Sequence, residues 1–345
     1  MLVAQIQMPN NQSGVTRPGS RIKQDAHQVF GKMSRPEKNP KPTVTTELVD
    51  QRNWLDLPED VTANILKRVG VFEILESAQK VCTAWRGICK DPAMWRVIDM
   101  ENTQELATPC ELEKMCMNAI DRSQGQLVDL NIEHFPTIEL IEFLAQGQRS
   151  SQLRRLQITH CYVSLYKSWS DFFKKAPLLE EISLSFTIIS EETVADISRY
   201  SPMLKSFTYN NYGWGFSIEM DRADDFVLAV GKGMSQLLHL QLTGSEMSNK
   251  GLQAILDGCP NLQSLDLRGC FDISLDGTCG KLCKERIKNL RLPGDSTAGL
   301  KVAPFDSEDD YDSEDDYDSD LCPDMCFPVS SDSDYAVDLV DYYSL

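Results

Sequence analysis

No stretch of this 345-residue chain reaches the roughly 18 consecutive apolar residues that a membrane-spanning helix requires. The first residues, MLVAQIQMPNNQSG, also lack the basic start and apolar core of a secretory signal. We therefore expect a protein that stays inside the cell and has no membrane partner.

The usual catalytic and metal-binding patterns are missing as well. The sequence has neither a glycine-rich phosphate loop nor a Gly-x-Ser-x-Gly turn around a nucleophilic serine. Its four histidines are isolated, and its eleven cysteines include no pair at the two-residue spacing of a zinc site. The odd number of scattered cysteines favours reduced thiols. The sequence thus predicts no catalytic residue, no metal and no cofactor, as in a protein that is not an enzyme.

Positive charge is absent from the end of the chain. Residues 306–345 contain fifteen Asp and Glu and no Lys or Arg, so they supply most of the formal charge of −18. Such a block predicts an acidic disordered tail over residues 305–345. A solvating role is favoured over attraction of a basic partner. Residues 1–50 predict a disordered arm whose spread-out basic charges, without interleaved aromatic residues, do not indicate nucleic-acid binding.

Residues 57–95 predict a compact helical module. Asp56 as an N-cap and Pro58 in the first turn indicate a helix start, and Gly70 is placed to end that helix. Two apolar faces recur at helical spacing, the first with Val61, Ile65 and Val69 and the second with Val81, Trp85 and Ile88. Because so short a module cannot bury all its apolar surface, we expect part of that surface to meet a partner.

This stretch resembles the F-box, the module by which substrate adaptors attach to the Skp subunit of Skp-Cullin-F-box ubiquitin ligases. Leu57-Pro58, Ile65-Leu66 and the Val-Cys-x-x-Trp-Arg motif from Val81 match the family pattern. The flanking RNW and PAMWRVIDM are similar to a plant-type subgroup with leucine-rich repeats. The resemblance implies a Cullin bound through Skp and a set of Skp contacts: Leu57, Pro58, Val61, Ile65, Leu66, Leu75, Val81, Cys82, Trp85 and Trp95. A small three-helix domain without this role is the alternative.

A leucine pattern repeats seven times after this module. The copies have the form Leu-x-x-Leu-x-Leu or a close variant, and they begin at Leu127, Leu153, Leu179, Leu204, Leu237, Leu262 and Ile287. Successive starts are 25 or 26 residues apart, except for 33 residues between Leu204 and Leu237. This period predicts an α/β fold, a leucine-rich-repeat solenoid that follows the helical F-box. We expect the F-box over residues 51–100 and the repeats over residues 101–304, with a first helix between 101 and 126.

Alternation along each predicted strand places polar side chains on the concave surface of the solenoid. We predict that this surface binds a target protein through Arg155, Glu181, His239, Asp266, Arg268 and Arg291. The strongest discrimination is expected from Asp266, Arg268 and Arg291. The long interval carries Tyr212, Trp214 and Phe216, which either bind a partner or tuck under their own loop.

These features together predict the substrate-recognition subunit of a Skp-Cullin-F-box ligase, located in the nucleus and the cytoplasm. Two alternatives remain, a leucine-rich-repeat scaffold that assembles no ligase and a small-molecule co-receptor like the plant hormone-sensing F-box proteins. The polar concave positions and the short array of seven repeats disfavour an enclosed ligand pocket. The sequence does not identify the target protein or any modification that the target needs.

Overall fold

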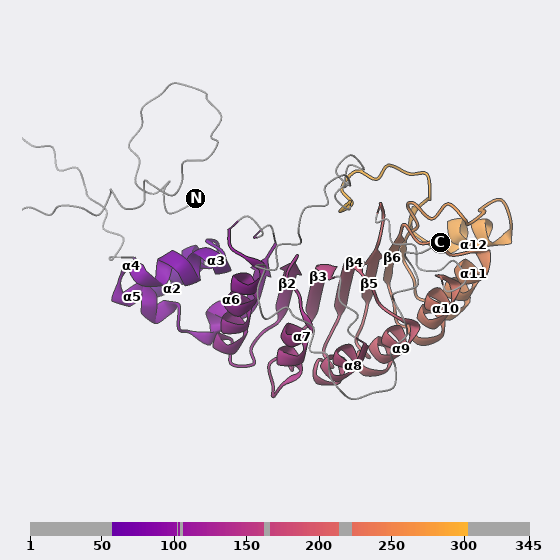
Figure 1. Cartoon of the computed structure of the whole chain (residues 1–345). Coiled ribbons are helices and arrows are strands. Elements are labelled where there is room, and N and C mark those ends of the chain that lie inside the picture. The colour runs from indigo at the N-terminus through magenta and orange to yellow at the C-terminus, as the bar shows by residue number, and fades with distance from the viewer. Residues whose placement is uncertain (1–56, 102, 104–105, 162–165, 214–222, 303–345) are drawn as a thin grey trace, which may run out of the picture. The chain divides into compact units, whose positions relative to one another are not determined.

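The computed structural model describes residues 57–101, 103, 106–161, 166–213 and 223–302 (Figure 1). The chain divides into two compact units, residues 1–69 and 70–345, and each is described by itself. The division falls inside the stretch predicted as the F-box, whose boundaries stay a prediction.

The described part of the first unit holds one helix, α2, at Glu59–Leu66. Pro58 is the N-cap residue, and its carbonyl oxygen accepts a hydrogen bond from the Thr62 hydroxyl at 3.2 Å. The predicted cap, Asp56, lies outside the described residues. A proline fits this position because it has no backbone N–H to leave unsatisfied.

The second unit begins with short helical segments. They are α3 at Val71–Glu73, the π-helical η2 at Ile74–Ala78, α4 at Gln79–Val81, α5 at Thr83–Ile88 and the 3₁₀ turn η3 at Pro92–Trp95. The Cys82 Sγ accepts a hydrogen bond from the Trp85 backbone N–H at 3.4 Å and so caps α5. Asp91 caps η3 through its Oδ1, which accepts from the Ala93 N–H at 2.9 Å. Asp91 and Pro92 thus restart a helical turn.

In the described part of the chain, eight parallel strands follow in one sheet, and their spatial order is their chain order. They are β1 at Val97–Met100, β2 at Asp129–Glu133, β3 at Arg155–Cys161, β4 at Glu181–Thr187, β5 at Ser206–Asn210, β6 at His239–Thr243, β7 at Ser264–Asp266 and β8 at Asn289–Arg291. The last seven coincide with the seven predicted repeats. The first, β1, was not predicted, although Trp95-x-x-Ile98-x-Met100 carries the same apolar spacing with other residues.

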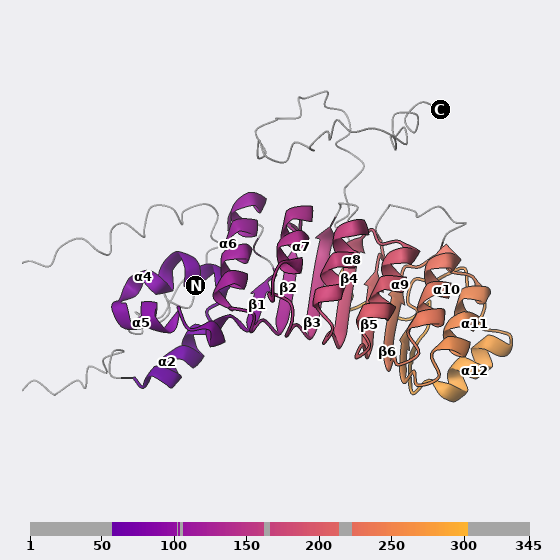
Figure 2. The same ribbon diagram turned by 90° about the horizontal axis from the view of Figure 1, so that it is seen from below.

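One helix stands between each pair of successive strands. The helices are α6 at Pro109–Arg122, α7 at Ile138–Ala145, α8 at Tyr166–Lys175, α9 at Glu191–Tyr200, α10 at Ala223–Gly233, α11 at Asn249–Gly258 and α12 at Thr278–Arg286. They form one layer against one face of the sheet (Figures 1 and 2). We call the opposite face, which no described helix covers, the open face. Strand, helix and parallel strand in this order confirm the predicted α/β repeat architecture.

The core lies between the sheet and the helix layer. Leu130, Leu156, Ile182 and Phe207 are paired in register and at most 1% exposed. On α8, the rings of Trp169 and Phe173 stack at 5.5 Å. Each buried Leu or Ile contributes about 1.5–3 kcal/mol, but only when the neighbouring repeat covers it. The repeats therefore stabilise one another.

Two properties of the described residues bear on the predicted chemistry. Eight cysteines of the described residues are free thiols. No helix in the described part of the chain combines the length and apolar character needed to span a membrane.

Candidate interaction surfaces

In the first unit, α2 and the residues before it present part of the predicted Skp-binding surface. Pro58 is exposed, Val61 is 39% exposed, and Leu57 and Ile65 are half-buried. Leu66 is fully buried, so its side chain belongs to the interior. Four of the five predicted contacts here are therefore accessible to a partner.

In the second unit, the predicted Skp contacts divide in the same way. Val81 is 58% exposed, and Cys82 and Trp85 are half-buried. Leu75 and Trp95 are buried, at 7% and 1% exposure. The expectation that Leu75 and Trp95 meet a partner directly does not agree with this structure, in which both side chains are buried.

Trp95 joins the F-box segment to the first repeat. Its Nε1 donates a hydrogen bond to the Cys89 carbonyl oxygen at 2.9 Å. The Arg122 guanidinium, from the end of α6, lies 5.2 Å from the Trp95 ring centroid and donates to the Gln79 Oε1 at 3.1 Å. Burial raises the pKa of the Cys89 thiol, which keeps it neutral. The segment from α4 to α6 is thus held together by the tryptophan, which has a structural role.

The open face carries rows of polar side chains, because alternate residues of every strand point away from the helices. The first row consists of Val97, Asp129, Arg155, Glu181, Ser206, His239, Ser264 and Asn289. The second row consists of Asp99, Asn131, Gln157, Ser183, Thr208, Gln241, Asp266 and Arg291. The register therefore brings Arg155, Glu181, His239, Asp266 and Arg291 to one face, where Asp266 is only 9% exposed. That these residues bind a target stays a prediction.

Arg268 does not lie in these rows. The register aligns Ser264 with His239 and Asp266 with Gln241, so Arg268 comes after the end of β7. Its side chain is only 11% exposed and forms an ion pair with Asp266 at 2.6 Å. This hydrogen-bonded pairing raises the pKa of Arg268. The expectation that Arg268 is exposed for target binding is wrong, because its guanidinium is mostly enclosed and paired with Asp266.

A shallow hollow of about 220 Å³ lies on the open face over β1 to β4. Its lining includes Asp99, Asp129, Arg155 and Glu181. Arg155 forms an ion pair with Asp129 at 2.7 Å, and Asp99 accepts a hydrogen bond from the Asn131 amide at 3.0 Å. Acidic groups therefore outnumber basic ones here, and the lining suits a polar or basic protein segment better than an apolar ligand.

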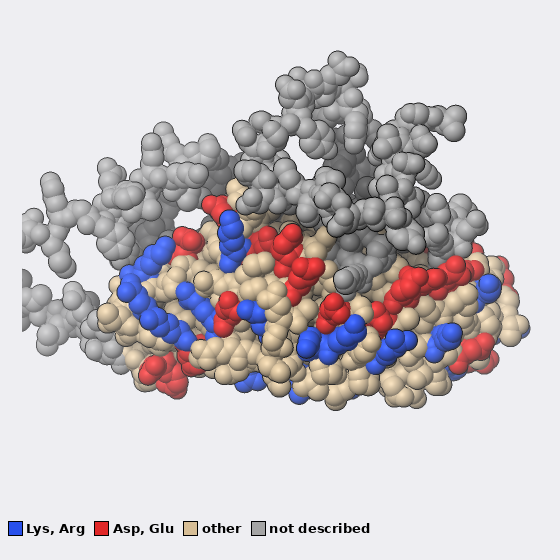
Figure 3. Space-filling model, turned by 60° about the horizontal axis from the view of Figure 1, so that its bottom comes forward, with Lys and Arg blue, Asp and Glu red and all other residues tan. Residues whose placement is uncertain are grey.

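Charges of both signs are interleaved on the described part of the face that Figure 3 presents. Exposed ion pairs among the described residues include Glu180 with Lys205 at 2.9 Å and Asp171 with Lys174 at 3.0 Å. Each such pair contributes about 0–1 kcal/mol.

Tyr212, at the start of the long interval, packs over two glycines. A Cβ on Gly269, where φ is +77°, would lie 2.4 Å from the Tyr212 Cδ2. A Cβ on Gly244 would lie 2.6 Å from the Tyr212 Cα. For Tyr212 the structure therefore favours the capping alternative. Trp214 and Phe216 lie outside the described residues.

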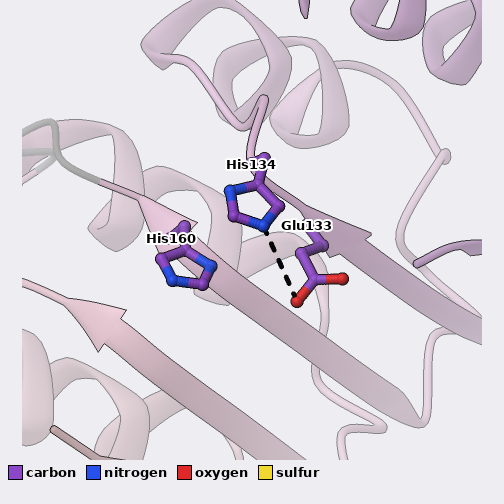
Figure 4. A group of neighbouring side chains, drawn as sticks. All are labelled: Glu133, His134 and His160. Carbon is purple, nitrogen blue, oxygen red and sulfur yellow. Dashed lines mark ion pairs between the residues drawn. The ribbon is translucent and has the colours of Figure 1, made fainter. Parts of the chain in front are cut away.

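Glu133, His134 and His160 form a cluster whose candidate ligand atoms lie within 4.8 Å of one another (Figure 4). The two imidazoles stack face to face, with centroids 4.1 Å apart and planes at 11°. Nitrogen lone pairs lie in the ring planes, so stacked rings do not aim them at one shared ion. The Lys301 ammonium also lies 3.2 Å from the Glu133 Oε1, where it would repel a metal cation. The geometry argues against a metal site.

Burial also sets the protonation of this cluster. His160 is 6% exposed, and its pKa falls from 6.5 to about 4, because of burial first and then the nearby His134 and Lys301. A neutral His160 stacks in turn on Phe186, with centroids 4.7 Å apart. His134, His160 and Phe186 occupy equivalent positions at the carboxyl ends of β2, β3 and β4, directly after β2 and next to last in β3 and β4, and have φ angles of 71°, 57° and 52°. This ring ladder was not predicted from the sequence, although the 26-residue spacing of the three rings is its signal.

Comparison with known proteins agrees with this architecture. An F-box-like family profile matches residues 54–101. F-box/LRR-repeat protein 23 of Arabidopsis thaliana is 44% identical over 246 residues, which cover 71% of this chain and 54% of the relative, so the chain spans about half of that protein's length. F-box protein SKIP19 of the same plant is 41% identical over 271 residues, which cover 78% of this chain and 87% of the relative. F-box/LRR-repeat protein 22 is 42% identical over 245 residues, 70% and 78% of the two chains. At this identity over most of the last two relatives, the chain belongs to the plant-type family of F-box proteins with leucine-rich repeats.

Proposed function

We propose that this protein is the substrate-recognition subunit of a Skp-Cullin-F-box ubiquitin ligase, present in the nucleus and the cytoplasm. Its F-box binds Skp, and through Skp a Cullin, while the repeats bind a target protein. The other subunits transfer ubiquitin, so the chain itself is a non-catalytic adaptor. The observation that carries the proposal is the F-box-like match at residues 54–101, which leads into a parallel sheet with an open polar face.

The accessible apolar residues of the F-box support Skp binding. Pro58 and Val61 are exposed in the first unit, and Val81 is 58% exposed in the second. Covering apolar surface releases about 25 cal/mol for each Å² removed from water. A partner helix or loop that covers these residues thus gains free energy from surface that the protein leaves uncovered.

The open face supports the binding of a protein rather than a small molecule. Its rows are polar and mixed in sign, and the hollow over β1 to β4 is shallow and charged. Hydrogen bonds and charge pairs across such a surface give specificity for a protein segment. The hollow over β1 to β4 does not favour the co-receptor alternative, because its lining is polar and charged.

Co-purification of Skp and Cullin with the full-length chain tests the proposal. The double variant Leu57→Ala/Pro58→Ala should lose both proteins, because it removes accessible apolar side chains at the start of α2. The control Arg155→Ala, on the open face, should retain both. A folded double variant that still recovers Skp would show that this motif is not the Skp-binding site.

A further inference from the structure

Residues 296–302 lie along the ends of the strands and contact several repeats. Arg268 donates hydrogen bonds to the carbonyl oxygens of Ser296 and Ala298, at 3.0 and 3.4 Å. The Asn210 Nδ2, at the end of β5, donates to the Lys301 carbonyl oxygen at 2.9 Å. The segment therefore runs back from the last repeats toward the first ones and ends among residues far from it in sequence.

Lys301 is the side chain that anchors this segment. Its ammonium lies 2.9 Å from the Glu101 carboxylate and 3.2 Å from the Glu133 carboxylate, and it donates to the Thr159 hydroxyl at 3.4 Å. The Glu133 side chain is 9% exposed and that of Lys301 is 31% exposed. Two carboxylates and a hydroxyl thus surround one ammonium in a partly dry slot, which is the chemistry that selects a cation.

The surroundings preserve the negative charge of the slot. His160, beside Lys301 and Glu133, has a pKa lowered to about 4, so it is neutral at physiological pH. Its neutral ring adds no positive charge to compete with the ammonium. The slot therefore keeps two acidic groups for one lysine.

Most other contacts to the segment are made to its backbone. Arg268 and Asn210 hold carbonyl oxygens, which every residue type carries. Such contacts bind an extended chain whatever its sequence, and selectivity then comes from the side-chain pockets. Here the pocket is the lysine slot. The same contacts would hold another extended segment with a lysine at the matching place.

We infer that Glu101, Glu133, Thr159, Asn210 and Arg268 form a peptide-binding track for an extended segment with an anchoring lysine, and that residues 296–302 occupy it in cis. The inference deepens the target-binding role proposed above and rests on it: a lysine-bearing segment of the target exchanges with the chain's own segment. A tethered segment has an effective concentration on the order of millimolar, so a free peptide binds only after the tethered one is weakened.

The test uses full-length protein and a fluorescent peptide of residues 294–302, GDSTAGLKV, followed by polarisation. The parent should not bind micromolar peptide. The Lys301→Ala variant should bind it, about tenfold more tightly than the peptide whose lysine is replaced by alanine. Adding Glu133→Gln to this variant should remove the preference, and higher salt should weaken binding.

The matched control is Lys288→Ala, which removes an exposed lysine near β8 and should behave like the parent. Circular dichroism checks that every variant is folded. Equal binding of the lysine and alanine peptides by Lys301→Ala would overturn the inference, as would binding of neither peptide by that variant. Skp co-purification is measured on the same proteins. Failure of the parent to recover Skp would contradict the proposed function, whereas the peptide measurements alone test the proposed peptide-binding track.

Discussion

His160 makes the stability of the folded chain depend on pH in a way that can be calculated. Its pKa falls from 6.5 to about 4 in the folded protein, mainly through burial and then through the charges of His134 and Lys301, which outweigh the opposite effect of Glu133. Between these pH values the unfolded chain binds a proton that the folded chain does not. The contribution of neutral His160 to the free energy of unfolding is therefore complete above pH 6.5 and is lost as the pH falls toward 4. Between pH 7.5 and pH 5 this loss is about 2 kcal/mol.

The variant His160→Asn removes this titration, and asparagine tolerates the φ of +57° at this turn. Urea unfolding at pH 7.5 and pH 5, followed by circular dichroism, gives the change in unfolding free energy for each protein. The parent should lose about 2 kcal/mol more than the variant over this interval. His239→Asn, at an exposed position of the open face, should keep the parental loss. An identical pH dependence for the parent and His160→Asn would refute the reasoning.

Three further predictions concern other parts of the chain. Gly269→Ala should lower the free energy of unfolding, measured by urea titration, by about 1–3 kcal/mol, because it places a Cβ at a φ of +77° against Tyr212. The control Gly277→Ala has open space around its Cβ and should change this free energy little. Arg268→Glu should lower the melting temperature, because it places a second carboxylate beside Asp266. Arg291→Glu, at an exposed position, should leave the melting temperature unchanged and weaken target recovery without affecting Skp. Equal melting temperatures for the two variants would contradict the buried pairing of Arg268 with Asp266. Deletion of residues 306–345 should leave the melting temperature nearly unchanged, because the fifteen like charges of this segment oppose its packing into a core, and a large drop in calorimetry would disprove that expectation.

The periodic features of the fold were predictable from the sequence. The 25- and 26-residue spacing located seven strands, because each strand must bury the same apolar positions against its neighbours. The strand β1 was missed because Trp95 and Met100 stand where the other repeats carry leucine or a close substitute. Arg268 was predicted to lie on the concave surface because the alternation of side chains was continued two residues beyond Asp266, where β7 ends.

Contacts without a period could not be predicted. Lys301 and Glu133 are 168 residues apart, and no local pattern indicates that the end of the array returns to its start. The enclosed position of Trp95 has the same origin, since it depends on Arg122 of a helix that follows later in the chain. Periodicity determines which side of a strand is apolar, but it does not determine which irregular segment covers a surface.

The ring ladder makes the repeats unequal as building blocks. The positive-φ position at the carboxyl end of the strand holds His134, His160 and Phe186 in the earlier repeats, but Gly244 and Gly269 in the later ones. Tyr212 from the long interval fills the space that those glycines leave. A repeat with a ring at this position therefore has no space for an insertion that carries a residue like Tyr212. Moving the Tyr212 segment to an earlier repeat would require glycines in place of His160 and Phe186. Shuffled or lengthened versions of this array will fold only if each insertion is moved together with the glycine turns that accommodate it.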